Sequence, residues 1–148
     1  MGQVLTDAGE EYVIKNGLDG LTTAVVGLYL DSTDAVTDTD IDPSTDITTE
    51  PGGAGYSRQT VEFSAADIGG NWGVDNDNAE SFDLSDSTTG SIDGYFVAIN
   101  FNSTEGGSTA DWVLWTGALS QTYTLSNVDT LNIAAGDGAG AGIGITLD

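Results

Sequence analysis

Two Asp-rich stretches are the parts of this sequence whose spacing most suggests chemistry. Oxygen ligands stand at alternate positions in Asp38-Thr39-Asp40-Ile41-Asp42 and in Asp75-Asn76-Asp77-Asn78, as they do where a calcium-binding loop begins. Neither stretch continues as such a loop requires; Pro43 and Thr49 stand where the first would need glycine and glutamate. We therefore predict solvated acidic loops and no metal site, with a specific calcium site as the alternative.

Three further patterns have a chemical interpretation that the sequence supports only weakly. The glycine-rich stretch 136–142 fits no dinucleotide or Walker pattern, so we interpret it as a turn between strands. Asn102-Ser103-Thr104 is an N-glycosylation acceptor triplet at an expected hairpin tip, and its glycosylation stays open. Arg58 is the only arginine and follows Tyr56 closely, so we expect it in a structural ion pair rather than in an active site.

Catalytic chemistry is narrowed by the absence of histidine and cysteine from the sequence. This composition removes the Ser-His-Asp arrangement, thiolate chemistry and the commonest general base near neutral pH. A mechanism with carboxylates alone would need two carboxyl groups in an apolar cleft, whereas most acids here lie in Asp/Ser/Thr-rich stretches. We predict that the chain is not an enzyme and has no catalytic, cofactor-binding or metal-binding residues, with a carboxylate glycosidase as a remote alternative.

The charge balance is the strongest feature of the composition, because 24 acidic residues face two basic ones and give a net charge of −22. At molar salt the Debye length falls to about 3 Å, so the carboxylates no longer repel one another and still hold water and cations. We interpret this as adaptation to very high salt; a calcium-loaded extracellular protein and a nucleic-acid mimic are the alternatives. Binding to nucleic acid is not expected, since it needs clustered Lys and Arg.

The pattern of apolar residues predicts an all-β fold with one short N-terminal helix. A capping Thr6, early acids, a late lysine and Gly17 predict a helix over residues 6–17, with Leu5, Ala8 and Tyr12 on its packing face. At 148 residues we expect one domain, 1–148, folded as a two-sheet antiparallel β-sandwich of the jelly-roll kind. No stretch is apolar enough to predict membrane insertion. Strands are predicted near 21–30, 58–63, 81–84, 94–101, 111–116, 121–125, 130–134 and 142–147.

Between these strands lies a long acidic loop, 31–55, which we expect at the surface because it offers little to bury. Other linkers are predicted at 64–78, 85–93 and 102–108. Two strands are apolar at consecutive positions, Tyr95–Ile99 and Trp112–Trp115, so each has an apolar face that one opposing sheet cannot cover. We expect the helix or a second copy of the chain to cover that surplus face, and therefore a homo-oligomer; plain packing in the core of the same chain is the alternative.

A series of strand motifs follows in a set order between residue 21 and the C-terminus. They are Gly55-Tyr56-Ser57-Arg58-Gln59-Thr60-Val61, the segments 94–101 and 112–119, Val128-Asp129-Thr130-Leu131, and Gly144-Ile145-Thr146-Leu147. In their order and spacing these motifs resemble the short β-rich virion proteins of tailed viruses, labelled tail-fibre, head-fibre or turret proteins. Acidic stretches at 37–50 and 85–93 and the long turn at 136–142 depart from that pattern.

The resemblance implies a structural protein with no catalytic residues and with oligomeric projections on a capsid or tail. We expect a capsid decoration or turret protein of a virus with a salt-loving host, assembled in the host cytoplasm and bound to the major capsid protein or a tail protein. A tail-fibre or tail-tip subunit is the nearest alternative. A carbohydrate-binding or adhesion module is another, in which an exposed Trp72 and acidic loops would form a sugar platform.

Overall fold

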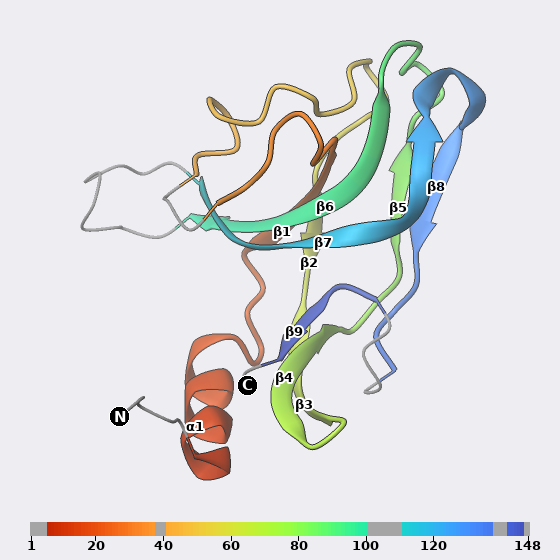
Figure 1. Ribbon diagram of the computed structural model, residues 1–148. Helices are drawn as coiled ribbons and strands as arrows, with labels where there is room; N and C mark the ends of the chain where they lie inside the picture. The colour runs from red at the N-terminus through yellow and green to blue at the C-terminus, as the bar shows by residue number, and fades with distance from the viewer. Residues whose placement is uncertain (1–5, 38–40, 101–110, 138–141, 147–148) are drawn as a thin grey trace. The chain divides into compact units, whose positions relative to one another are not determined.

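A computed structural model describes residues 6–37, 41–100, 111–137 and 142–146. These residues form one α-helix, one 3-10 helix and strands in three sheets, which confirms an all-β fold with a short N-terminal helix (Figure 1). The sandwich arrangement stays a prediction. The elements are α1 (Asp7–Gly17), β1 (Ala24–Tyr29), β2 (Gln59–Val61), β3 (Phe63–Ile68), β4 (Asn71–Asn76), β5 (Glu80–Asp83), β6 (Ser91–Asn100), β7 (Asp111–Thr124), η1 (Leu125–Asn127), β8 (Thr130–Ile133) and β9 (Gly144–Thr146).

The chain divides into two compact units, which are described separately. The first comprises Met1–Thr22, Val61–Glu80 and Asn132–Asp148, and the second Thr23–Thr60 and Ser81–Leu131. The strand order is β3-β4-β9 in one sheet, β2-β1-β6-β7 in the second and β5-β8 in the third. The prediction of a single domain over 1–148 stays a prediction.

In the first unit, α1 begins and ends almost where the sequence predicts. The Thr6 hydroxyl caps the helix by accepting a hydrogen bond from Gly9 N at 3.2 Å. Asp7 and Glu10 lie in the first turn and Lys15 in the last, as the helix dipole favours. The helix ends where Leu18 N donates to Ile14 O.

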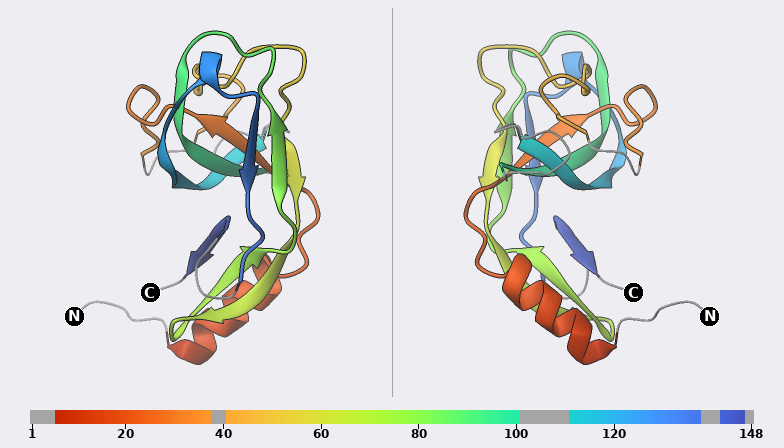
Figure 2. Two further views of the ribbon diagram at one scale, coloured as in Figure 1. Left: turned by 90° about the vertical axis from the view of Figure 1, so that its right-hand side faces the viewer. Right: turned by 90° about the vertical axis from the view of Figure 1, so that its left-hand side faces the viewer.

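The predicted packing face of α1 is wrong. Ile14 is fully buried and Glu10 nearly so, whereas Tyr12 is 70% exposed and Ala8 is exposed; Leu5 lies outside the described residues. Residues four apart share a helix face, so Glu10 and Ile14 form the stripe that packs. The helix lies against β4 (Figure 2), where the Lys15 amine stands over the Trp72 ring at 4.7 Å.

The hairpin of β3 and β4 occupies residues predicted as a linker, 64–78. Its register pairs Phe63 with Asn76 and Ile68 with Asn71. Gly69 and Gly70 form the two-residue turn with φ of 66° and 97°, a conformation that glycine adopts without strain. The sequence prediction failed because the Ser, Ala and Asp residues of β3 have low strand propensity, so the pairing with β4 overrides local preference.

In the second unit, β1 and β6 form the centre of the four-stranded sheet. They pair antiparallel, with Val26 opposite Val97 and Leu28 opposite Tyr95. β6 pairs antiparallel with β7, which is one strand of 14 residues where two were predicted, 111–116 and 121–125. The division expected between them coincides with an irregularity in β7.

β7 carries two bulges against β6. At the first, Val97 faces Trp115 and Ala98 faces Val113, so Leu114 is an extra residue and the tryptophans Trp112 and Trp115 lie on one face of the sheet. At the second, which we call the wide bulge because four residues of β7 lie opposite one of β6, Ile92 faces Tyr123 and Gly94 faces Ala118. Asp93 alone therefore lies opposite residues 119–122 of β7.

Residues 31–55 form no helix or strand among those described, as predicted, but they are not only surface. Ile47 is 7% exposed and packs in a cluster with Tyr29, Phe96 and Ala98, and Pro43 and Pro51 are buried as well. This corrects the sequence interpretation of the loop. The apolar face that β6 shows at Phe96 and Ala98 is covered by this loop, where the helix or a second copy was expected.

Candidate functional site

A polar pocket in the second unit is built at the wide bulge between β6 and β7. Asp93 enters it from β6, and Asp31 follows the end of β1 by two residues. The Asp31 N–H donates to Asp93 Oδ1 at 2.7 Å, which joins the two strands at the pocket. The hydroxyl of the buried Tyr29 donates to Asp31 Oδ1, also at 2.7 Å, and so restrains the orientation of the Asp31 carboxylate.

The pocket has a volume of about 410 Å³. Besides the two aspartates and Tyr29 it is lined by bulge residues of β7, among them Ala118, Leu119, Gln121 and Thr122. Because strand pairing resumes on both sides of the bulge, these side chains stand on a fixed frame rather than on a free loop.

Tyr29 orients one of the pocket's carboxylates, because its single O–H is donated to Asp31 Oδ1. Its side chain is 1% exposed, and burial raises its pKa to about 12, with the Asp31 carboxylate adding to the shift. The hydroxyl therefore stays protonated across the physiological range. The pocket can bind a ligand through carboxylate, amide and hydroxyl groups.

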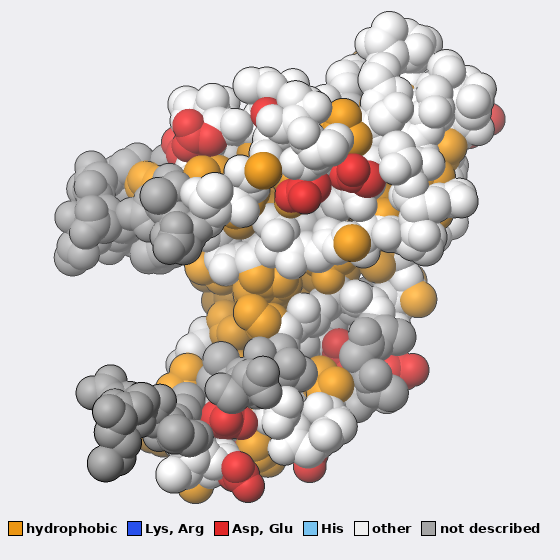
Figure 3. Space-filling model, viewed as in Figure 1, with side chains coloured by type: hydrophobic (Ala, Val, Ile, Leu, Met, Phe, Trp, Pro, Cys, Tyr) orange, Lys and Arg blue, Asp and Glu red, His pale blue; other side chains and the backbone are white. Residues whose placement is uncertain are grey.

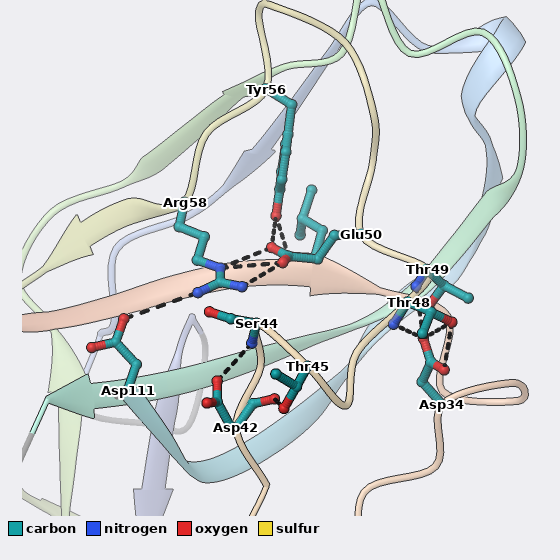
Figure 4. Close-up of polar contacts among 11 residues, drawn as sticks. Asp34, Asp42, Ser44, Thr45, Thr48, Thr49, Glu50, Tyr56, Arg58 and Asp111 are labelled. Atoms are coloured by element: carbon teal, nitrogen blue, oxygen red, sulfur yellow. Dashed lines mark hydrogen bonds and ion pairs between the residues drawn. The ribbon is translucent and has the colours of Figure 1, made fainter. Parts of the chain in front are cut away.

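The second polar assembly centres on Arg58, where the predicted ion pair is confirmed (Figure 4). The guanidinium donates to both oxygens of Glu50, Nη2 to Oε2 at 2.6 Å and Nε to Oε1 at 3.0 Å. The Tyr56 hydroxyl donates to Glu50 Oε1 at 2.8 Å and accepts from Leu28 N at 2.9 Å. Arg58 also approaches Asp111 at 3.9 Å and lies 5.2 Å from the centre of the Phe96 ring.

The electrostatics of this assembly favour a structural role. Hydrogen bonding to Glu50 raises the pKa of Arg58 above its already high value, so its charge is permanent. Burial and the adjacent Glu50 carboxylate raise the pKa of Tyr56, so its proton is held. Because neither group changes its protonation near neutral pH, their contacts with Glu50 persist. These contacts fasten the loop at Glu50 to β1 and β2.

Several carboxylates close the acidic loops on themselves (Figure 4). Asp34 Oδ2 accepts from Thr48 N at 2.8 Å and from Thr49 N at 2.7 Å. Asp42 Oδ1 accepts from Ser44 N at 2.8 Å, an arrangement in which a side chain replaces a backbone turn bond. These acids therefore shape the surface as well as charge it.

The structure brings neither Asp-rich stretch together as a calcium loop. Residues 38–40 lie outside the described part, and Asp42 is engaged in its own turn. Asp75 and Asn76 are buried in β4, which corrects the prediction of a solvated loop there. Within the described residues no three Asp or Glu side chains converge as metal ligands would.

Asn76 instead organises the glycine-rich segment. Its Nδ2 donates to Ala134 O at 3.1 Å, and its Oδ1 accepts from Ile143 N at 2.7 Å. A Cβ at Gly136 would meet Asp75, and one at Gly142 would meet Asn76 Oδ1. Gly136 and Gly142 thus permit close packing. Residues 138–141 between them lie outside the described part, so the interpretation of 136–142 as a turn stays a prediction.

Two remaining predictions have different outcomes. Trp72 is not the exposed platform proposed for a sugar, since its ring is half-buried and its face is covered by Lys15. The expected hairpin turn 102–108 and the triplet at Asn102 lie outside the described residues.

Sequence reasoning missed the pocket of Asp31 and Asp93. Residues 85–93 were assigned to a linker and Asp31 to the start of a surface loop, so nothing placed the two carboxylates together. The signal that could have pointed there is Gly117 inside an otherwise strand-like stretch, with the polar run Ser120-Gln121-Thr122 shortly after it; a glycine within a strand often marks a bulge.

Comparison with known proteins gives no relative: no protein-family model, curated protein or solved structure matches this chain significantly. In the described part of the chain, no helix has the length and apolar character needed to span a membrane. On the face shown in Figure 3, Asp and Glu side chains lie on both compact units.

Proposed function

We propose that this chain is a structural virion protein that forms capsid-surface projections, of the decoration or turret kind, on a tailed virus of a high-salt host. The observation that carries the proposal is the role of the Gly-Tyr-x-Arg-Gln element. Tyr56 and Arg58 of that element converge on Glu50 and fasten an acidic loop to the sheet. The resemblance depends partly on this motif, and a holding role for it agrees with a family without catalytic residues.

The acidic surface supports the high-salt part of the proposal. Both basic residues are engaged in ion pairs, Lys15 with Glu11 at 2.6 Å and Arg58 with Glu50 at 2.6 Å. With two basic residues for 24 acidic ones, the chain cannot neutralise most of its carboxylates, so their mutual repulsion must be screened by dissolved ions.

Self-association is part of the proposal, and β7 supports it better than β6, the other apolar strand from which it was predicted. The surplus apolar face of β6 is covered by the loop at Ile47, whereas Trp112, Leu114 and Trp115 of β7 are each only partly buried. β7 also lies at the end of its sheet in the strand order. Contacts between copies through β7 would bury these side chains and strengthen as salt rises.

The experiment that tests the proposal locates the chain in particles. Virus banded from a high-salt culture that expresses the chain is analysed by peptide mass spectrometry, and an antibody to the chain is followed by electron microscopy. Stoichiometric peptides with label over the capsid are expected. Antibody label on the tail would favour a tail-fibre subunit instead, and a chain found only in host cytoplasm would refute the proposal. Sedimentation between 0.5 and 3 M KCl tests the association.

A further inference from the structure

We propose that the pocket at the wide bulge of β6 and β7 binds a neutral polyhydroxylated ligand, a saccharide unit, through Asp31, Asp93 and Gln121. This goes beyond the proposed structural function and does not depend on it. It also differs from a sugar platform at Trp72, which the structure does not support.

The size of the pocket favours an organic ligand over a bare ion. About 410 Å³ lies within the range of roughly 300–1,000 Å³ that is common for small-molecule sites. A single water molecule has a share of only about 30 Å³ in the liquid, so an ion of similar size would leave most of the pocket to solvent. A space of this size admits a saccharide ring.

The carboxylates are held ready to accept hydrogen bonds. Asp31 Oδ1 is engaged by the Tyr29 hydroxyl and Asp93 Oδ1 by Asp31 N, each at 2.7 Å. Their Oδ2 atoms have no such bond among the described residues. Since both side chains are already oriented, little conformational entropy remains to be lost when a ligand binds.

The mixture of groups favours hydroxyls over charges as the ligand chemistry. Gln121 and Thr122 line the same pocket and can both donate and accept, as sugar hydroxyls do. An anion would be repelled by Asp31 and Asp93, and a bare cation, which only oxygens can ligate here, would leave the amide N–H donors of Gln121 unused. Ala118 and Leu119 add apolar contact of the kind that the C–H face of a sugar ring accepts.

The test measures binding of defined sugars to the full chain in 3 M KCl. Methyl glycosides of glucose, galactose and mannose, and N-acetylglucosamine, serve as probes in ligand-observed NMR, with titration calorimetry for any that bind. Asp93→Asn keeps an oxygen that can accept from Asp31 N but removes the charge, and should weaken binding about tenfold. Gln121→Ala, at an exposed position, should weaken it several-fold with the fold intact.

Asp67→Asn is the matched control. Asp67 also accepts a backbone bond, from Gly70 N at 2.9 Å, and the change also removes one negative charge, but Asp67 does not line the pocket. The affinity of the Asp67→Asn variant for sugars should equal that of the wild type. Absence of binding to every sugar by a chain with native melting behaviour would overturn the proposal. So would equal losses in the control, or Asp93-dependent binding of Ca²⁺ or spermidine in place of sugars. The result does not depend on where the chain lies in virus particles, so it can fail while the proposed structural function stands.

Discussion

Ile47 offers a direct test of the finding that the acidic loop is part of the core. Its side chain is 7% exposed and packs on Tyr29, Phe96 and Ala98. Truncation by Ile47→Ala removes roughly three methylene equivalents at about 0.8 kcal/mol each, and the cavity left behind adds to this cost. We expect a loss of about 3 kcal/mol in unfolding free energy, which corresponds to a fall in Tm of roughly 6–12 °C for a chain of this length.

Urea unfolding in 3 M KCl, followed by tryptophan fluorescence, measures this loss. Ile47→Val should cost about 1 kcal/mol, so that the series is graded by the volume removed. Ser44→Ala, at an exposed position of the same loop, should change stability by less than about 0.5 kcal/mol. If Ile47→Ala behaved like Ser44→Ala, the loop would be a solvated surface segment and its assignment to the core would be wrong.

Three further predictions concern charge. The fold should melt at far lower temperature in 0.1 M than in 3 M KCl, because the net charge of −22 is then unscreened; an unchanged Tm would contradict the high-salt interpretation. A double-mutant cycle with Arg58→Met and Glu50→Gln should give a coupling of about 2 kcal/mol that persists at 3 M KCl, since the pair is bidentate and mostly buried; a coupling near zero would assign it to the weak surface class. Burial raises the pKa of Asp34, but hydrogen bonds from Thr49 and Thr48 outweigh this and hold it below 3.8, so its contribution to stability is present above that pH and fades as the pH falls through the lowered pKa. Asp34→Asn should remove that part of the acid sensitivity in melting curves between pH 2 and 5, and an unaltered pH profile would count against it.

The sequence predicts well those elements whose local signals agree with their environment. The cap at Thr6 and the apolar run of β6 specify a helix start and a buried strand, and both are present. β3 could not be predicted because its strand form depends on pairing with β4 rather than on its own Ser and Ala residues. The packing face of α1 was misjudged because burial of Glu10 beside Ile14 depends on what β4 presents to the helix.

The candidate sites differ in the same way. An ion pair for Arg58 follows from composition, since a lone arginine among many acids must meet one of them, but the identity of Glu50 depends on how the loop folds back. The pocket requires Asp31 and Asp93 to meet across a bulge, and they lie 62 positions apart in the sequence. Neither residue has a local pattern that indicates a partner at such a distance.

The wide bulge in β7 also bears on how this protein could change over evolutionary time. Register is set on one side by Ala118 opposite Gly94 and on the other by Tyr123 opposite Ile92. Residues 119–122 between these pairs can be lengthened, shortened or exchanged while the flanking pairs stay in place, because they make no regular ladder with β6. A lineage under pressure to recognise new ligands could therefore diversify this one segment while the sheet that carries it remained the same.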